Sequence, residues 1–142
     1  MFLDVPLITQ DKPMACWHAS VRMLFAFRNQ SADPLDLQYV ADQGITASQF
    51  VDLATAAGLD TIPQVNQSYD WRFIDGLLGN FGPIWAAGDW NGPPHVVVIR
   101  GVDSGGKLAV NDPAFSTPQS RDMGWFNKHI AKDVKIPMMY LL

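Results

Sequence analysis

The segment Thr9–Ser20, TQDKPMACWHAS, holds the single cysteine of the 142-residue chain, Cys16. A cysteine attacks a carbonyl carbon as its thiolate, and a helix N-terminus stabilises that anion through free N–H groups and a partial positive charge. We predict a helix over 16–28, where no Gly or Pro occurs, which places Cys16 in its first turn. Such a nucleophile also needs a base and a group that orients the base.

His95 is the best candidate for the base. It opens the apolar segment HVVVIRGV straight after the loop DWNGPP, where the side chain of a strand's first residue can face a cleft. The orienting group should come from the partner strand, where VNDPA offers Asn111 and Asp112. Both side chains can accept a hydrogen bond from an imidazole, but only Asp112 adds a charge that stabilises imidazolium.

The register of this hairpin decides between the two residues. A connecting loop with an even number of residues pairs Val97 with Asp112, which sets Asp112 diagonally beside His95 on the same face. An odd loop pairs Val97 with Asn111 instead. We favour Asp112 and keep Asn111 as the alternative.

The tetrahedral intermediate of acyl transfer carries an oxyanion that needs hydrogen-bond donors. Gln10 precedes Cys16 by six positions, and a loop of this length can fold the Gln10 amide back over the helix start. The predicted donors are therefore the Gln10 amide and the backbone N–H of Cys16.

These residues also have plainer structural interpretations. A lone cysteine is often a small buried side chain, Asp112 fits ordinary turn chemistry, and Gln10 could be a loop residue. Their occurrence together and in order favours catalysis. The remaining histidines fit less well, because His18 points about 200° around the helix from Cys16 and His129 is expected at the surface.

Composition excludes several classes of protein. Hydrophobic residues make up 48% and charged residues 17%, with a formal net charge of -4, which is typical of a globular domain and argues against nucleic acid or an anionic membrane as a partner. One cysteine allows no internal disulfide, and the three histidines lack metal-ligand spacing. No apolar run approaches the roughly 20 residues of a membrane span, and MFLDVPLITQ lacks a signal peptide's basic start.

Helices are predicted first along the chain, after a short edge strand over 2–8. Gly, Pro and capping residues mark their ends. The predicted signals beyond the helix over 16–28 are Asp33 with Pro34 and then Gly44, Thr46 with Gln49 and then Gly58, and Ser68 before a helix near 69–79. The apolar face of the helix that follows Thr46 is expected to contain Ala47, Phe50, Val51 and Ala54.

Strands are predicted to follow. The segment 95–102 is apolar enough to be buried on both faces, and 107–112 pairs back across the turn DSGG. A short helix is expected near 118–131, and other extended segments are 61–65, 82–88 and 134–142. Helices that lead and strands that follow favour an α+β fold, in a single domain over 1–142.

Two motifs together resemble the papain-like cysteine proteases. They are Q-x5-C-W-x-A-S, which contains Gln10 and Cys16, and HVVVIRGVD…VNDP, which contains His95 and Asp112. The chain is most similar to a compact bacterial branch that includes secreted effector proteases and peptidases for double-glycine leader peptides. DKPMACW replaces the glycine-rich approach of plant and animal papains, and their Asn-Ser-Trp is absent, so substrate pockets are not carried over.

The resemblance implies a papain-like fold, with the nucleophile on an N-terminal helical half and His and Asp on a C-terminal antiparallel sheet. It implies a triad of Cys16, His95 and Asp112, with Gln10 in the oxyanion hole. The expected activity is that of a cysteine endopeptidase on a protein substrate, with no metal or organic cofactor. Cleavage after small residues such as Gly-Gly fits the double-glycine relatives.

The expected role is that of a bacterial toxin or effector domain, which is secreted by a specialised system without a signal peptide. It would act in the cytoplasm of a target cell and be blocked by a cognate immunity protein. The alternatives are a peptidase that processes leader peptides, a deamidase or transglutaminase with the same triad, and a binding module that has lost catalysis.

Overall fold

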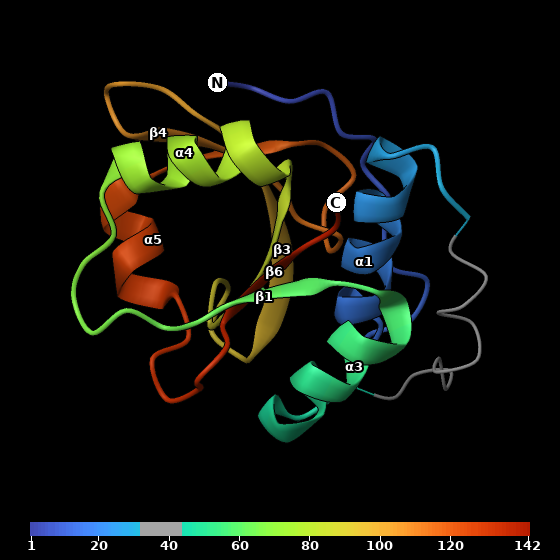
Figure 1. The fold of residues 1–142 in the computed structure, drawn as a ribbon. Helices are drawn as coiled ribbons and strands as arrows, with labels where there is room; N and C mark the ends of the chain where they lie inside the picture. The colour runs from blue at the N-terminus through green and yellow to red at the C-terminus, as the bar shows by residue number, and fades with distance from the viewer. Residues whose placement is uncertain (32–43) are drawn as a thin grey trace.

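The computed structural model describes residues 1–31 and 44–142 (Figure 1). The described part is α+β, as predicted, and contains a six-stranded antiparallel sheet of order β1-β6-β2-β3-β4-β5. The elements are α1 (Cys16–Phe27), η1 (Ala47–Gln49), α3 (Phe50–Ala57), β1 (Asp60–Ile62), α4 (Trp71–Phe81), β2 (Ile84–Gly88), β3 (His95–Val102), β4 (Lys107–Asn111), β5 (Gln119–Asp122), α5 (Met123–His129) and β6 (Met138–Tyr140).

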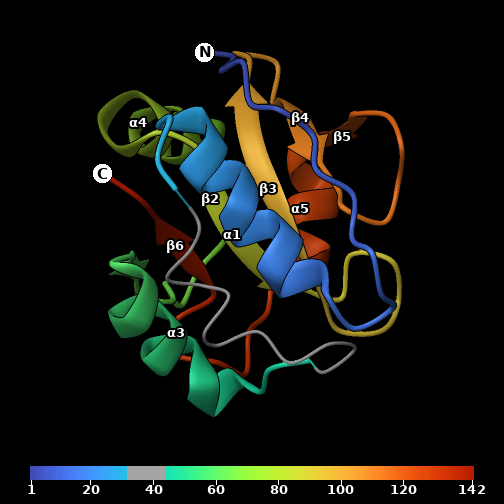
Figure 2. The same cartoon turned by 90° about the vertical axis from the view of Figure 1, so that its right-hand side faces the viewer.

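Helices cover both faces of the central strands. Figure 2 shows α1 lying across β3 on one face, with α5 behind the sheet. The core on the α1 face also receives α3 and includes Val96 and Val98, whereas Val97 and Ile99 belong to the core under α4 and α5. Strand β3 is thus buried on both faces, as its apolar sequence predicts.

Helix α1 fits its prediction closely. It follows a turn in which the Ala15 N–H donates to the Lys12 carbonyl at 3.1 Å. It ends where Asn29 adopts a left-handed φ of 52°, a conformation that Asn tolerates better than most residues. The turn and this stop restrict the helix to Cys16–Phe27 and leave Cys16 at its very start.

The next described helix begins with the predicted capping box, in which the Thr46 N–H donates to Gln49 Oε1 at 2.7 Å. Gly58 ends it with a φ of 72°. The predicted apolar face is partly wrong, because Val51 is 49% exposed and Ala47 also faces solvent. The prediction assumed α-helical spacing from Ala47 onward, but the first turn is a 3-10 helix, which has fewer residues per turn. The buried face is formed by Phe50, Leu53, Ala54 and Ala57. The helix predicted from Asp33 lies almost wholly outside the described residues.

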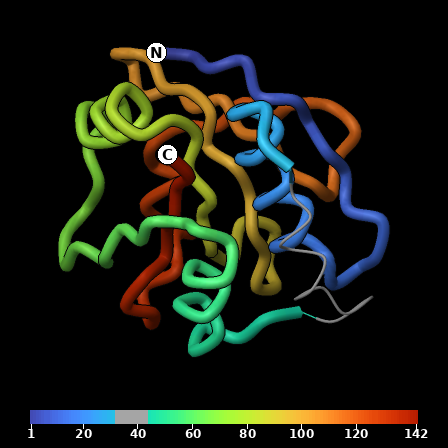
Figure 3. The backbone as a smooth tube through the Cα atoms, turned by 45° about the vertical axis from the view of Figure 1, so that its right-hand side comes forward, coloured from blue at the N-terminus to red at the C-terminus, as the bar shows by residue number. Residues whose placement is uncertain are grey.

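The predicted edge strand over 2–8 is reduced to one bridge between Phe2 and Gly101. Strand β2 pairs with β3 only as far as Ile99. The Leu3 N–H can therefore donate to the carbonyl of the next residue of β3, Arg100, at 2.7 Å. At Val5 the backbone carbonyl accepts from a side chain, Asn111 Nδ2, instead of from a strand. Figure 3 traces this segment from the sheet to the loop before α1.

Two other predicted boundaries need correction. Helix α4 is capped by Asp70, whose carboxylate accepts from the Arg72 N–H at 2.8 Å, and not by Ser68. The segment near 118–131 is a strand followed by a short helix, because Asp122 caps α5 through the Trp125 N–H. Within the described residues, no helix is long and apolar enough to cross a membrane.

Candidate active site

Cys16 is the first residue of α1 and is partly exposed. The residue before it, Ala15, has no side-chain oxygen that could cap the helix. The N–H groups of a helix's first turn point toward its N-terminus, which is the end that carries the Cys16 sulfur. Trp17 is buried, and its carbonyl accepts from the indole N–H of Trp85 in the core at 3.3 Å. The residue after Cys16 therefore anchors the helix start to the sheet.

The hairpin of β3 and β4 does not reach its register in the predicted way. Asp103 donates its N–H to the Lys107 carbonyl at 3.0 Å, so the loop is 104–106, an odd number of residues, and Gly106 takes a φ of 79° that suits glycine. A β-bulge at Arg100 then shifts the register between Ile99 and Gly101.

Beyond the bulge, Val98 pairs with Asn111. The same register, continued by one residue, sets Val97 opposite Asp112. The arrangement that we associated with an even loop is thus produced by an odd loop together with a bulge. The bulge is what brings Asp112 to His95.

His95 and Asp112 form a direct pair. The ring nitrogen Nε2 of His95 lies 2.5 Å from Asp112 Oδ1. Both side chains are largely shielded from water, with exposed fractions of 11% and 5%. Cys16 also interacts with the His95 side chain and contributes to its raised pKa. Because Nε2 faces Asp112, Nδ1 is the ring nitrogen that remains for the sulfur.

Electrostatics favour the protonated ring. Burial disfavours imidazolium, but the hydrogen bonds to Asp112 and Cys16, together with their charges, raise the pKa of His95 to about 9. Burial also raises the pKa of Asp112, yet the hydrogen bonds from His95, the Ala114 N–H and Asn91 outweigh it and hold that pKa below its usual range. The pair is therefore ionic at neutral pH.

Asn111, the alternative orienting residue, has a different role. It is fully buried and faces away from His95: Nδ2 donates to the Val5 carbonyl at 2.9 Å, and Oδ1 accepts from Arg100 Nε at 3.1 Å. It ties the N-terminal segment to the bulged residue. The structure therefore brings Asp112, and not Asn111, to the imidazole.

Gln10 lies near the site, but its amide is engaged elsewhere. Nε2 donates to the carbonyls of Lys12 at 3.0 Å and Pro13 at 2.9 Å, which uses both amide hydrogens. Its Oε1 is buried without a hydrogen-bond partner among the described residues. The backbone N–H of Gln10 donates to the Pro113 carbonyl at 2.9 Å, so this loop is attached to the residue after Asp112. The oxyanion role of Gln10 stays a prediction.

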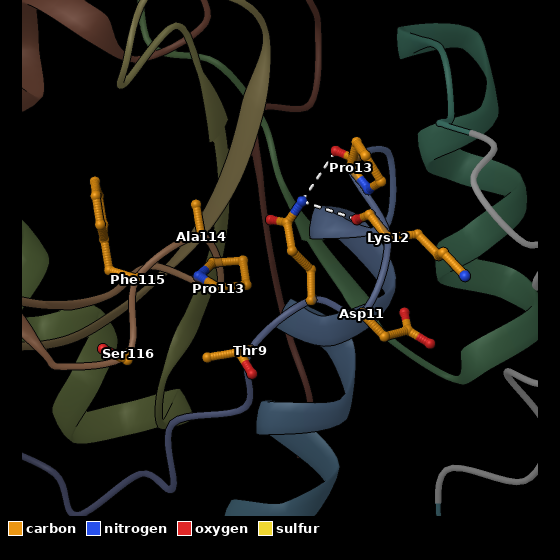
Figure 4. Close-up of a pocket in the computed structure, with 9 residues that line it drawn as sticks. Thr9, Asp11, Lys12, Pro13, Pro113, Ala114, Phe115 and Ser116 are labelled. Carbon is orange, nitrogen blue, oxygen red and sulfur yellow. Dashed lines mark hydrogen bonds between the residues drawn. The ribbon is translucent and has the colours of Figure 1, made fainter.

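A pocket of about 580 Å³ opens between these two loops (Figure 4). In the close-up, Pro113, Ala114 and Phe115 form a wall opposite Lys12 and Pro13. Phe115 is 39% exposed. The pocket thus opens beside Asp112's neighbour Pro113, with apolar side chains on one wall and the loop of Asp11 and Lys12 on the other.

The other histidines lie apart from this pair. His18 is buried and its ring contacts that of Trp17, and His129 Nδ1 pairs with Asp89 Oδ1 at 2.9 Å. Over residues 1–31 and 44–142, no three His, Cys, Asp or Glu side chains are arranged to hold a metal ion.

Sequence reasoning missed one side chain at the site. Asn91 Nδ2 donates to Asp112 Oδ2 at 2.9 Å. Its position in DWNGPP, four residues before His95, was the available signal, since that loop leads directly into the candidate base.

The chain is similar to known proteins. The model of a family described as papain-like cysteine protease AvrRpt2 matches residues 1–131. Twelve chains of solved structures match significantly. One is the crystal structure of a double glycine motif protease from an AMS/PCAT transporter in complex with the leader peptide, with a TM-score of 0.65 at 22% identity over 99% of this chain and 91% of that chain. At this identity the match concerns the fold. No curated protein matches the sequence significantly.

Proposed function

The chain belongs to the papain-like cysteine protease family of AvrRpt2, and from this membership we propose that it is an endopeptidase whose catalytic triad is Cys16, His95 and Asp112. The observation that carries the proposal is the position of His95. Its ring bonds Asp112 through Nε2, and Cys16 contributes to the raised pKa of the same ring. A nucleophile, a base and an orienting group thus occupy one site.

The proposed reaction begins when Cys16 Sγ attacks the carbonyl carbon of a substrate peptide, while the thiol proton resides on His95. The resulting tetrahedral intermediate collapses as the C–N bond breaks and His95 gives its proton to the leaving amine. Water then transfers a proton to His95 and attacks the thioester. Breakage of the C–S bond releases the acid and regenerates Cys16.

We place the oxyanion beside the backbone N–H of Cys16, at the start of α1. Gln10 can supply the second donor only if its amide gives up one of the two carbonyls that it now contacts. The buried Oε1 has no described partner to lose in such a rotation. Substrate binding between the loops would drive the change, because the amide would exchange a loop carbonyl for an oxyanion.

The proposed substrate is a protein held in an extended conformation. His95 must reach the leaving nitrogen, so the segment after the scissile bond runs toward Asp112 and the residues that follow it. The pocket between residues 9–13 and 113–116 lies on that side. Cleavage after small residues such as Gly-Gly is proposed from the resemblance to double-glycine peptidases.

The proposal is tested by expressing the chain and its Cys16→Ala variant in a bacterial cytoplasm and comparing cellular proteins for new termini by mass spectrometry. New termini that depend on Cys16 establish an endopeptidase and give its specificity directly. His95→Ala should abolish the same termini, whereas Asn80→Ala, at an exposed residue on α4, should keep them. Identical termini from the wild type and Cys16→Ala would contradict the proposal.

A deamidase or transglutaminase is the proposed alternative, because the same triad can accept a glutamine side chain as acyl donor. The same mass spectra separate these activities. Cys16-dependent conversion of Gln to Glu without new termini would show a deamidase in place of an endopeptidase. New Gln–Lys crosslinks without new termini would show a transglutaminase. A leader peptidase would instead cut a purified double-glycine peptide at one bond and leave cytoplasmic proteins intact.

The biological role of an effector or toxin that acts in a target cell, secreted by a specialised system, remains our proposal from the resemblance. It predicts that expression of the wild type slows growth and that Cys16→Ala does not. A cognate immunity protein would restore growth when co-expressed. Normal growth, together with cleavage confined to the double-glycine peptide, would argue for the processing role.

A further inference from the structure

The Asp112 carboxylate makes hydrogen bonds through both of its oxygens. Oδ1 accepts from His95 and from the Ala114 N–H at 2.9 Å, and Oδ2 accepts from Asn91 Nδ2 at 2.9 Å. The carboxylate is 5% exposed, whereas Asn91 is itself an exposed residue. The Asn91 amide therefore sits between this carboxylate and solvent.

The loop that carries Asn91 is anchored on either side of it. Trp90 is 3% exposed, donates its indole N–H to the Ala86 carbonyl at 3.1 Å and packs 4.7 Å from the ring of Trp125. Asp89 bonds His129 through both its side chain and its N–H, at 2.9 Å each. The Gly92 N–H closes a turn onto the Asp89 carbonyl at 3.0 Å. Asn91 is thus presented at a set position.

We propose that Asn91 is a positioning residue of the active site, which holds the Asp112 carboxylate in the orientation that keeps His95 directed at Cys16. This inference rests on the proposed triad. Without the Asn91 amide, Oδ2 would lose its hydrogen bond in a largely buried place, and the carboxylate could rotate toward water. His95 would then lose the fixed partner that orients its ring.

The charge environment makes the role testable with an isosteric variant. The titratable groups around the Asp112 carboxylate are His95 and, across the ring, Cys16, while the Asp89 carboxylate is turned to His129. Asn91→Asp keeps size and turn preference but places a second carboxylate against Asp112. At neutral pH it should repel Asp112, and at low pH its protonated form could donate again.

The experiment measures kcat and KM against pH for the wild type, Asn91→Ala and Asn91→Asp. Asn80→Ala is the matched control, because Asn80 is also exposed and donates Nδ2 at 2.8 Å, but to Gly76 on α4. At neutral pH we expect kcat to fall about tenfold in Asn91→Ala and further in Asn91→Asp, with KM nearly unchanged. The deficit of Asn91→Asp should shrink as pH falls.

A second measurement does not depend on activity. The imidazole of His95, assigned with His95→Gln, is titrated by NMR in the same proteins. His95 should titrate with a pKa of about 9 in the wild type and with a lower pKa in Asn91→Ala. Its pKa in Asn80→Ala should equal that of the wild type. If the wild type cleaved no peptide, the proposed function would fail while this titration still tested Asn91. The inference would be overturned if His95 in Asn91→Ala titrated at the same pH as in the wild type. Full activity of Asn91→Asp at neutral pH would also overturn it.

Discussion

Cys16, His95 and Asp112 come from three separate segments and meet at His95, whose ring bonds Asp112 and whose raised pKa has a contribution from Cys16. The arrangement also fixes where the protons lie. Asp112 stays ionised because its pKa is lowered, and His95 stays protonated because its pKa is raised to about 9. At the residue scale, His95 should therefore set the pH at which activity is lost on the alkaline side.

We predict that kcat/KM of the wild type falls as pH rises through about 9, where His95 loses its proton. Asp112→Asn removes one of the charges that raise this pKa, so the alkaline limb should move to lower pH and kcat should fall. The pH dependence of kcat/KM measures both effects. Asp52→Asn, which alters an exposed carboxylate on α3, should leave the profile in place; an unmoved limb in Asp112→Asn would contradict the account.

The same shifts predict how stability depends on pH. The pKa of His95 is raised on folding, so its contribution is fully present below the unfolded value near 6.5 and is lost as pH rises through about 9. The pKa of Asp112 is lowered, so its contribution is present above the unfolded value near 3.8 and is lost at lower pH. Urea unfolding at several pH values should show the alkaline loss in the wild type and not in His95→Gln.

Gln10 is the residue whose predicted role needs a movement. If its amide binds the oxyanion, Gln10→Ala should lower kcat about a hundredfold with little change in KM, and Gln10→Glu should be worse because its charge opposes the oxyanion. Gln119→Ala is the matched control, since Gln119 Nε2 also donates to a carbonyl two residues away, that of Thr117 at 2.9 Å. A loss in thermal stability at unchanged kcat would limit Gln10 to holding its loop.

At the element scale, the bulge in β3 decides which side chain reaches His95. The loop 104–106 sets one register and the extra residue Arg100 changes it before the strand arrives at the site. Asn111 hydrogen-bonds the side chain of Arg100 and the backbone carbonyl of Val5. The last residue of β4, Asn111, thus serves the fold, and the residue that follows the strand, Asp112, serves the candidate chemistry.

This division predicts contrasting effects for Asn111 and Asp112. Asn111→Ala leaves the Val5 carbonyl without its donor in a fully buried place, which should lower the free energy of unfolding by about 1–3 kcal/mol. The folded fraction should keep much of its kcat. Urea denaturation measures the loss, and Asn80→Ala should change the free energy by less than about 0.5 kcal/mol. Equal stability of Asn111→Ala and wild type would show that these bonds do not secure the bulge.

At the scale of the whole molecule, two cores share one sheet. Met23 on α1 and Ile74 on α4 lie in different cores, and both are essentially inaccessible to solvent. Each core uses alternate residues of the same strand, β3. We therefore expect the two cores to unfold together, which keeps the single domain over 1–142 a testable prediction.

The test compares urea unfolding followed by tryptophan fluorescence and by far-UV circular dichroism. Both probes should report one transition with the same midpoint. Met23→Ala and Ile74→Ala should each lower the free energy of unfolding by about 2–5 kcal/mol and shift both probes equally. Separate transitions, or a shift confined to one probe, would divide the chain into two folding units.

Local signals in the sequence were sufficient for much of this protein. The α+β class, the helix that begins at Cys16, the buried strand that begins at His95 and the resemblance to papain-like cysteine proteases are all confirmed. These features depend on apolar periodicity, helix punctuation and the order of a few residues. The helix and the strand are each encoded by neighbouring positions, whereas the class and the resemblance follow from the order of such segments along the chain.

The tertiary structure decided what depends on distant partners. Arg100 at the bulge bonds Asn111, which in turn bonds Val5; β5 pairs with the edge of β4; and the Gln10 amide turns to carbonyls of its own loop. Asn91 reaches Asp112 only because Trp90 and His129 anchor its turn. A sequence by itself determines which side chains can do chemistry and roughly where strands and helices lie. Register and side-chain direction follow from packing between segments far apart in the chain, so only the folded structure selects Asp112 and adds Asn91.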